Sequence, residues 1–233
     1  MQIQTGIKKR GRLILLYGSP GIGKTTLAST APEPLFIDLE NGTDEIDVAR
    51  LTVKTADDFI EALRVAYKSE YKTIVIDSAT ALERRLSDQI CTERKIKSLA
   101  RAGYGAGFQD LKDAWMRLLT PIEAIQLTGR NVILIGHSKV RSVNDTVLGD
   151  AYDRTEIDVH KDSVQALVSA SDIILLMREE MTLKEDNNRT RAFGSGQRAI
   201  YTADSPSFLA KTRLKLPPVI KLKDDNFWST HVI

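Results

Sequence analysis

A glycine-rich stretch near the amino terminus constrains this chain more than any other feature. Residues 17–26 read YGSPGIGKTT and match the pattern G-x-x-x-x-G-K-[ST], with an apolar run before them and the helix-compatible KTTLAST at their end. Glycines let the backbone turn its N–H groups toward phosphate oxygens, and a following helix adds the positive end of its dipole. We therefore predict a phosphate-binding loop made of Gly18, Ser19, Pro20, Gly21, Ile22, Gly23, Lys24, Thr25 and Thr26.

The chemistry expected at such a loop involves a nucleotide and a magnesium ion. In this pattern the lysine, here Lys24, reaches the β- and γ-phosphates, and the next hydroxyl, that of Thr25, binds Mg²⁺. Asp77 ends the apolar stretch Ile-Val-Ile and offers the acid that a second magnesium contact requires, usually through water. Asp77 or Ser78 can also cap a following helix, and the two roles are compatible. The expected cofactors are ATP and Mg²⁺.

Apolar runs alternate with segments of helical spacing along most of the chain. The runs lie at residues 13–17, 35–37, 74–76, 132–135 and 173–177 and are mostly Ile, Val and Leu without alternation, which is typical of strands buried on both faces. Between them, apolar side chains in residues 59–67 and 108–125 recur in steps of three and four, and Pro121 can kink or divide the second helix. We predict an α/β fold with a mainly parallel central sheet flanked by helices.

The pattern changes after Met177, where shorter strands and polar turns are expected. The best turn signal is Asp-Asn-Asn at residues 186–188, and the tail carries Pro217-Pro218. We predict a single domain over residues 1–233, with a core at about 12–178 and a small C-terminal β appendage and tail at about 179–233.

An acidic pair follows the second apolar run. In PLFIDLENG, residues 34–42, Asp38 and Glu40 stand at the end of a strand expected to be buried, where a carboxylate is costly to desolvate unless something uses it. Ligands bind beyond the carboxyl ends of strands in open α/β sheets. Glu40 is the better candidate for a general base that positions water, Asp38 is the second candidate or an orienting neighbour, and a solvated acid in an Asn-Gly turn is the alternative.

Composition excludes several classes of protein. The net charge of +2 gives no overall basicity, so a nucleic-acid surface would have to be local. The single cysteine, Cys91, cannot form an internal disulfide, the apolar run after the basic amino terminus is too short for a signal peptide, and no stretch reaches the roughly 20 apolar residues of a membrane span. We expect a cytoplasmic protein with no membrane partner.

Four stretches together resemble the RecA recombinase core. They are the phosphate loop, FIDLENG at residues 36–42, TIVIDSATAL at 73–82 and NVILIGHSKVRSV at 131–143, and they occur in the RecA order. The chain is also similar to short, phage-type RecA-like ATP-binding proteins, including the single-strand annealing group called Sak four, in its DSAT motif, its Tyr-Gly-x-Gly segment at 104–107 and His137. By contrast, a small GTPase would carry an N-K-x-D motif, a nucleotide kinase an arginine-rich lid, and a hexameric AAA+ unloader an acid after Asp77.

The resemblance implies a catalytic set and a function. Glu40 would polarise the attacking water, Lys24 would act on the phosphates, and His137 would sense the γ-phosphate. The implied function is a DNA-stimulated ATP hydrolase that binds single-stranded DNA and promotes annealing or strand pairing in recombination, with hydrolysis as the reset. The alternatives are a weakly hydrolysing, nucleotide-switched adaptor or loader and, less favoured, a small-molecule phosphotransferase.

Two segments are candidates for contact with DNA, and the tail is a candidate for contact between subunits. The first segment is expected to be a loop after the Asp77 strand, at residues 84–101; it is locally basic and opens into AGYGAG, where a tyrosine between glycines could stack on a base. The second is expected to be a mobile loop over residues 138–161, in which acids outnumber bases. A homo-oligomer is expected, a ring or short filament rather than a long one, with a single-strand-binding protein as a further candidate partner. The DNA candidates are Arg94, Lys95, Lys97, Arg101, Tyr104, Lys139 and Arg141, and the candidates for reaching a neighbour's γ-phosphate are Lys211 and Arg213.

Overall fold

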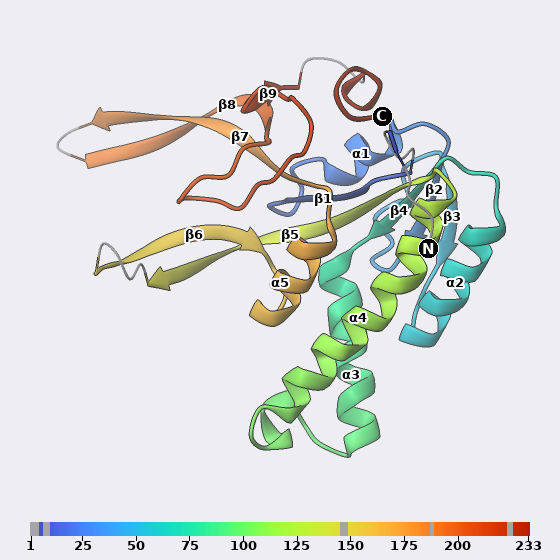
Figure 1. Cartoon of the computed structure of the whole chain (residues 1–233). Helices are drawn as coiled ribbons and strands as arrows, with labels where there is room; N and C mark the ends of the chain where they lie inside the picture. Colours follow the sequence, from blue (N-terminus) through green and yellow to red (C-terminus); the bar gives the residue numbers. More distant parts are fainter. Residues whose placement is uncertain (1–4, 7–9, 145–148, 187–188, 223–225) are drawn as a thin grey trace.

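The central feature of the computed structural model is a twisted sheet whose strands run in the order β3-β2-β4-β5-β1-β7-β8-β9 (Figure 1). The structure describes residues 5–6, 10–144, 149–186, 189–222 and 226–233. The six strands from β3 to β7 in this order are parallel, which confirms the predicted α/β fold. Their bounds are β1 (Leu13–Gly18), β2 (Pro34–Asp38), β3 (Ala49–Thr52), β4 (Thr73–Asp77), β5 (Asn131–Asn144) and β7 (Ile173–Asp186).

Helices cover both faces of this sheet. Along β1, Leu13, Leu15 and Tyr17 pack into one hydrophobic cluster, and Ile14 and Leu16 pack into the other. The first cluster contains side chains of four helices, and the second contains side chains of α1 and of a short C-terminal helix. The helices are α1 (Lys24–Ser29), α2 (Ala56–Lys68), α3 (Ala79–Arg94), α4 (Ala106–Leu127), α5 (Lys161–Ala170) and the C-terminal Trp228–Val232.

The segment expected to be a mobile loop after the fourth apolar run is a β-hairpin, so that prediction is wrong. β5 continues well beyond residue 135 to Asn144 and pairs antiparallel with β6 (Ala151–Ile157), after which α5 begins at Lys161. The β-branched residues Val140, Val143 and Thr155 suit a pleated ribbon even though charges separate them. Residues 145–148, between the two strands, lie outside the described part of the chain.

The basic segment after Asp77 is helical for most of its length, which corrects its assignment as a loop. The Ser78 hydroxyl accepts a hydrogen bond from the Ala81 amide at 3.2 Å and caps α3, which runs on to Arg94. Lys95 then takes a left-handed conformation, with φ of 56°, and ends the helix. A short 3₁₀ turn, Leu99–Ala102, leads to α4, which continues through Pro121 without being divided. Figure 1 shows α3 and α4 side by side, projecting away from the sheet.

The predicted β appendage continues the main sheet. β7 extends past residue 177 and pairs antiparallel with β8 (Arg189–Tyr201), which in turn pairs with β9 (Val219–Lys221). The predicted turn at 186–188 falls where β7 ends, and residues 187–188 lie outside the described residues. No helix in the described ranges is both long and apolar enough to cross a bilayer.

Candidate functional site

The phosphate loop lies between the end of β1 and the start of α1, as its sequence predicts. Gly18, the last residue of β1, is paired with His137 of β5 on one side and with Met177 of β7 on the other. Gly23 has φ of 100°, a left-handed conformation that favours glycine. The buried Lys24 ammonium donates to the carbonyl oxygens of Gly18 and Ser19, at 3.0 and 2.9 Å. Burial lowers the pKa of Lys24, and the carboxylates of the site oppose that shift.

Thr25 and Asp77, the two predicted magnesium ligands, are in direct contact. Thr25 Oγ1 donates to Asp77 Oδ2 at 2.7 Å, and Asp77 stands at the carboxyl end of β4 with only 4% of its surface exposed. Burial raises the pKa of Asp77, the Thr25 hydroxyl lowers it, and the carboxylates of Glu40 and Asp38 raise it further. The peptide bond between Asp77 and Ser78 is cis.

The oxygens of this pair fit a magnesium ion. At nucleotide sites Mg²⁺ is held by one or two protein oxygens together with phosphates and water. A Cβ placed on Gly42 would lie 3.3 Å from Asp77 Oδ2 and 3.8 Å from Thr25 Oγ1, so the absence of a side chain there keeps space beside both oxygens. Within the described residues no group of three or more His, Cys, Asp and Glu side chains is placed to hold a metal ion.

Asp38 uses its carboxylate to hold the turn that follows β2. Its Oδ1 accepts from the backbone N–H groups of Glu40 and Gly42, at 3.0 and 3.3 Å, and its Oδ2 accepts from the Thr43 amide and hydroxyl, at 3.1 and 2.5 Å. Burial raises the pKa of Asp38, but these hydrogen bonds together outweigh it, so the pKa lies below its ordinary value. These hydrogen bonds fix the backbone of Glu40, which is part of the same turn.

Glu40 contacts the residue that follows β4 and a residue within β5. Its Oε2 accepts from the Ser78 hydroxyl at 2.5 Å and lies 3.3 Å from His137 Nε2. The His137 amide donates to Thr80 Oγ1 at 3.1 Å, which joins β5 to the first turn of α3. The structure therefore brings Glu40, Ser78 and His137 together beside Asp77, at the carboxyl edge of the sheet.

The residues predicted to contact DNA fall into two separate groups. Lys139 and Arg141 lie on β5 and, with Arg84 of α3, line a cavity of about 380 Å³ between α3, the start of α4 and the β5–β6 hairpin. Lys139 lies 3.5 Å from Asp158, and Arg141 lies 3.4 Å from Glu156. The other group is at the far end of the α3–α4 projection: Arg94, which pairs with Asp110, then Lys95, Lys97, Arg101 and the fully exposed Tyr104.

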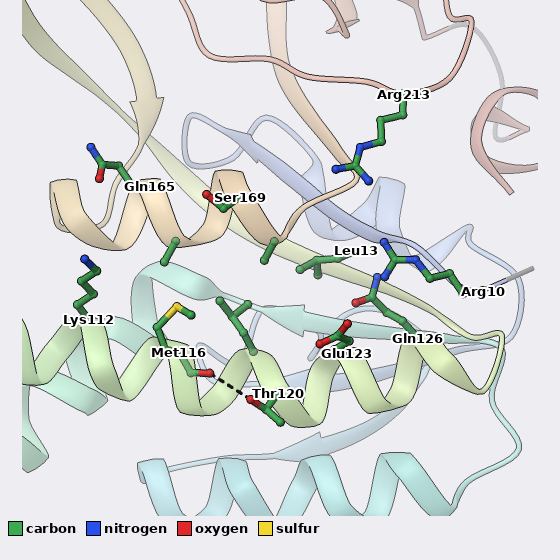
Figure 2. A pocket seen from close by; sticks show the side chains of 13 residues that line it. Arg10, Leu13, Lys112, Met116, Thr120, Glu123, Gln126, Gln165, Ser169 and Arg213 are labelled. Atoms are coloured by element: carbon green, nitrogen blue, oxygen red, sulfur yellow. Dashed lines mark hydrogen bonds between the residues drawn. The ribbon is translucent and has the colours of Figure 1, made fainter. Parts of the chain in front are cut away.

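Lys211 and Arg213 lie at the opposite, amino edge of the sheet. Lys211 Nζ donates to the carbonyl oxygens of Val168 and Ser171, at 2.8 and 2.7 Å, and burial lowers its pKa. Arg213 donates to Asp172 at 3.2 Å while 62% of its side chain stays exposed. Figure 2 shows Arg213 beside a cavity of about 580 Å³ between α4 and α5. Neither residue can reach the phosphate loop of its own chain.

Several residues of the site were not predicted from the sequence. Ser78 was expected only as a helix cap, yet it also holds Glu40, and Thr80 holds the backbone of His137. Arg198 of β8 lies against the phosphate loop, with its Nη1 3.4 Å from the Ile22 carbonyl oxygen. Nothing local in the sequence marks these contacts, because each depends on strands far apart in the chain.

Three comparisons with known proteins bear on this site. A curated relative, the SPbeta prophage-derived uncharacterized protein YorG of Bacillus subtilis (strain 168), is 24% identical over 135 residues, which cover 55% of this chain. The matched part spans 41% of that relative's length. A solved structure, that of a KaiC-like protein from Pyrococcus horikoshii OT3, aligns with a TM-score of 0.46 and 16% identity over 92% of this chain and 91% of that one.

The third comparison concerns protein families. Residues 10–214 match the family described as AAA domain, a range that includes the phosphate loop, Glu40, Asp77 and His137. The family description names no substrate and no assembly, so the likeness to the annealing group stays a prediction. Because the match covers most of the sequence, the chain belongs to the AAA domain family, as a P-loop ATPase whose phosphate loop lies at the carboxyl edge of the sheet.

Proposed function

We propose that this ATPase acts on single-stranded DNA and promotes annealing or strand pairing, with ATP hydrolysis as the step that resets the bound state. The prophage origin of the Bacillus subtilis relative supports a phage-type setting. The protein would work as a homo-oligomer, a ring or short filament, and a single-strand-binding protein is a candidate partner. A non-hydrolysing or weakly hydrolysing adaptor that uses the same nucleotide switch is the alternative.

In the proposed reaction, a water molecule attacks the γ-phosphorus while the bond between that phosphorus and the bridging oxygen of ADP breaks. Glu40 accepts the proton of the water, and its contacts with Ser78 and His137 through Oε2 leave Oε1 for that task. Lys24 would exchange its two carbonyl contacts for phosphate oxygens. Magnesium held at Thr25 and Asp77 would neutralise charge on the β- and γ-phosphates.

The observation that carries the proposal is the continuity of β5. This strand, Asn131–Asn144, passes from the sheet, through His137 beside Glu40, into the projecting hairpin that bears Lys139 and Arg141. A change at the γ-phosphate that moves His137 would therefore act directly on the candidate DNA-binding strand. Such a direct connection favours a nucleotide-controlled DNA contact over a phosphotransferase, which would need an acceptor site instead.

Phosphate release with and without single-stranded DNA tests the proposal. Wild-type protein should release phosphate faster when DNA is added, and Glu40→Gln should lower kcat by two to four orders of magnitude, roughly what a general base supplies, while still binding ATP. The Lys24→Ala variant serves as a control that loses nucleotide binding as well.

Three results would count against it. If DNA leaves the rate of wild-type protein unchanged, the DNA role fails. If Glu40→Gln turns over as fast as wild type, the assignment of the base fails. Turnover that depends on a small-molecule acceptor would show a phosphotransferase instead.

A further inference from the structure

Arg198 occupies the space that a side chain at Gly23 would need. The Nη1 atom lies 2.3 Å from the position of a Cβ built on Gly23, and it donates to the Ile22 carbonyl oxygen at 3.4 Å. The left-handed backbone favours glycine at this position, and the absence of a side chain lets the guanidinium of Arg198 pack directly against the loop. This arginine comes from β8, about 175 residues further along the chain than the loop that it contacts.

Strand pairing explains why the guanidinium lies there. Met177 of β7 is paired with Gly18 of the loop strand on one side and with Ile200 of β8 on the other. Ile200 points into the cluster that packs around α1, and Arg198, two residues away on the same strand, lies on the same face. The pairing of β1 with β7 and of β7 with β8 therefore places the guanidinium of Arg198 beside the phosphate loop.

A break in the ladder shapes this part of the hairpin. The register between β7 and β8 shifts between Glu179 and Met181, directly beyond the pair formed by Glu179 and Arg198. The Glu179 carboxylate accepts the Gly196 amide at 2.6 Å, which ties the bulged region together. Bulges beside active sites commonly redirect a side chain, and this one lies next to the residue that reaches the loop.

Negative charge dominates the site, so a second cation beside Lys24 would favour binding of a nucleoside triphosphate. Three carboxylates, those of Asp38, Glu40 and Asp77, stand at this edge of the sheet, and Lys24 is the buried cation of the loop. A nucleoside triphosphate brings several further negative charges. Arg198 is exposed, so its charge costs little to keep beside the loop, and its fork of donors suits phosphate oxygens as well as carbonyls.

We propose that Arg198 is a positioning residue that acts in cis on the phosphate loop. It holds the Ile22–Gly23 backbone in the shape that receives the nucleoside triphosphate, and it places a second positive charge beside the phosphates. Because Arg198 is part of β8, nucleotide binding at the loop also restrains the β7–β8 hairpin. The inference rests on the nucleotide binding of the family and is independent of any action on DNA.

The test compares Arg198→Ala with Arg198→Lys and with Lys221→Ala. Lys221 lies on the adjacent β9, is exposed and pairs with Glu180 at 3.0 Å, so its loss removes one charge from the same sheet without touching the loop. Binding of a fluorescent, non-hydrolysable ATP analogue with Mg²⁺ should weaken roughly tenfold in Arg198→Ala. Arg198→Lys should recover part of that loss, and Lys221→Ala should match wild type.

Two further readouts separate positioning from general destabilisation. Without nucleotide, amide hydrogen exchange at residues 21–24 should be faster in Arg198→Ala than in Lys221→Ala. In steady-state kinetics Arg198→Ala should raise KM for ATP about tenfold with less than a threefold change in kcat, since the loop contacts substrate and transition state alike.

Unchanged analogue binding in Arg198→Ala, or equal effects of Arg198→Ala and Lys221→Ala, would overturn the inference while leaving the ATPase intact. If wild-type protein bound no analogue, the nucleotide site itself would be refuted and the inference with it. Absence of stimulation by DNA would refute only the proposed action on DNA.

Discussion

At the scale of single residues, two acids separated by one position do different work. Both carboxylate oxygens of Asp38 accept hydrogen bonds within the turn after β2, whereas the carboxylate of Glu40 contacts Ser78 and His137. The first acid therefore determines where the second one points. A substitution at Asp38 should damage the site indirectly, through the position of Glu40, while a substitution at Glu40 removes the proposed base.

Replacing Asp38 with Asn should destabilise the fold in a pH-dependent way. The pKa of Asp38 is lower in the folded chain than in the unfolded one, so its contribution is complete above the unfolded value, about 3.9, and is lost as pH falls through the folded pKa. At pH 7 Asp38→Asn should lower the free energy of unfolding by roughly 1–3 kcal/mol.

Urea unfolding at pH 7 and at successively lower pH measures this difference. The gap between wild type and Asp38→Asn should narrow as pH falls below about 4. A gap of the same size at all pH values would mean that the charge of Asp38 does not stabilise the turn.

The positions of Lys24, Thr25 and Asp77 could be predicted from local patterns, the first two from the glycine-rich stretch and the third from the end of an apolar run. The structure places Thr25 and Asp77 in contact beside Lys24, and their role as magnesium ligands stays a prediction. Arg198 could not be predicted, since it reaches the loop only through the pairing of β8 with β7. The second role of Ser78 is similar, because a helix cap is visible in the sequence but a partner from another strand is not.

At the scale of elements, the two candidate DNA-binding groups differ in their connection to the nucleotide. The β5–β6 hairpin is continuous with the strand that carries His137. The end of the α3–α4 projection is separated from Asp77 by the 16 residues of α3, about 24 Å of helix. Of the two groups, only the one on the hairpin lies on a strand that carries a residue of the candidate site, so we expect only its affinity for DNA to depend on the nucleotide.

Two matched double substitutions should separate these groups. Lys139→Gln with Arg141→Gln, and Lys95→Gln with Lys97→Gln, each remove two positive charges. Each pair should reduce the slope of log affinity against log salt for single-stranded DNA by about 1.4, because each lost phosphate contact accounts for about 0.7.

The nucleotide analogue distinguishes the pairs in the same titration. Loss of affinity in the hairpin pair should be larger with the ATP analogue than without it, whereas loss in the Lys95 and Lys97 pair should be the same in both. Equal losses in both pairs under both conditions would contradict a nucleotide-controlled hairpin.

Five of the parallel strands and the helices α1, α2 and α4 were predictable from apolar runs and helical spacing, but their ends were not, and β3, α3 and α5 were not predicted. β5 was predicted to stop where its apolar run stops, yet the ladder with β6 carries it on through charged residues. The basic segment at residues 84–101 was interpreted as a loop although Ser78 was also considered as a helix cap, and the capping bond of Ser78 starts a helix that runs on to Arg94. Pairing with β6 therefore determines where β5 ends, and local capping by Ser78 determines that α3 forms.

At the scale of the whole molecule, candidate functional residues lie at both edges of the sheet. The predicted nucleotide-binding residues lie at the carboxyl edge, and Arg213 lies at the amino edge, where it shares the Asp172 carboxylate with Arg10. If the chain assembles with the amino edge of one copy against the carboxyl edge of the next, Arg213 would face a neighbour's phosphates. A heterologous contact of this kind produces rings or helical filaments.

Mixing experiments test this arrangement. Arg213→Ala alone and Lys24→Ala alone should both show low DNA-stimulated phosphate release, and a mixture should recover part of it, since each variant supplies what the other lacks. Arg10→Ala, which loses a 2.8 Å bond to the same carboxylate, is the matched control and should keep its activity. No recovery in the mixture, or an equal loss in Arg10→Ala, would confine Arg213 to holding Asp172.

The C-terminal helix carries a tryptophan whose fluorescence can report on the neighbouring helix α1. Of the two tryptophans in the chain, Trp228 is buried against α1, where its indole N–H donates to the Leu27 carbonyl oxygen at 2.6 Å. The other, Trp115, lies in α4 on the opposite face of the sheet and donates to Glu83. A Trp115→Phe chain would thus emit from a single indole that touches the helix after the phosphate loop, so nucleotide exchange could be followed by intrinsic fluorescence without attaching a dye.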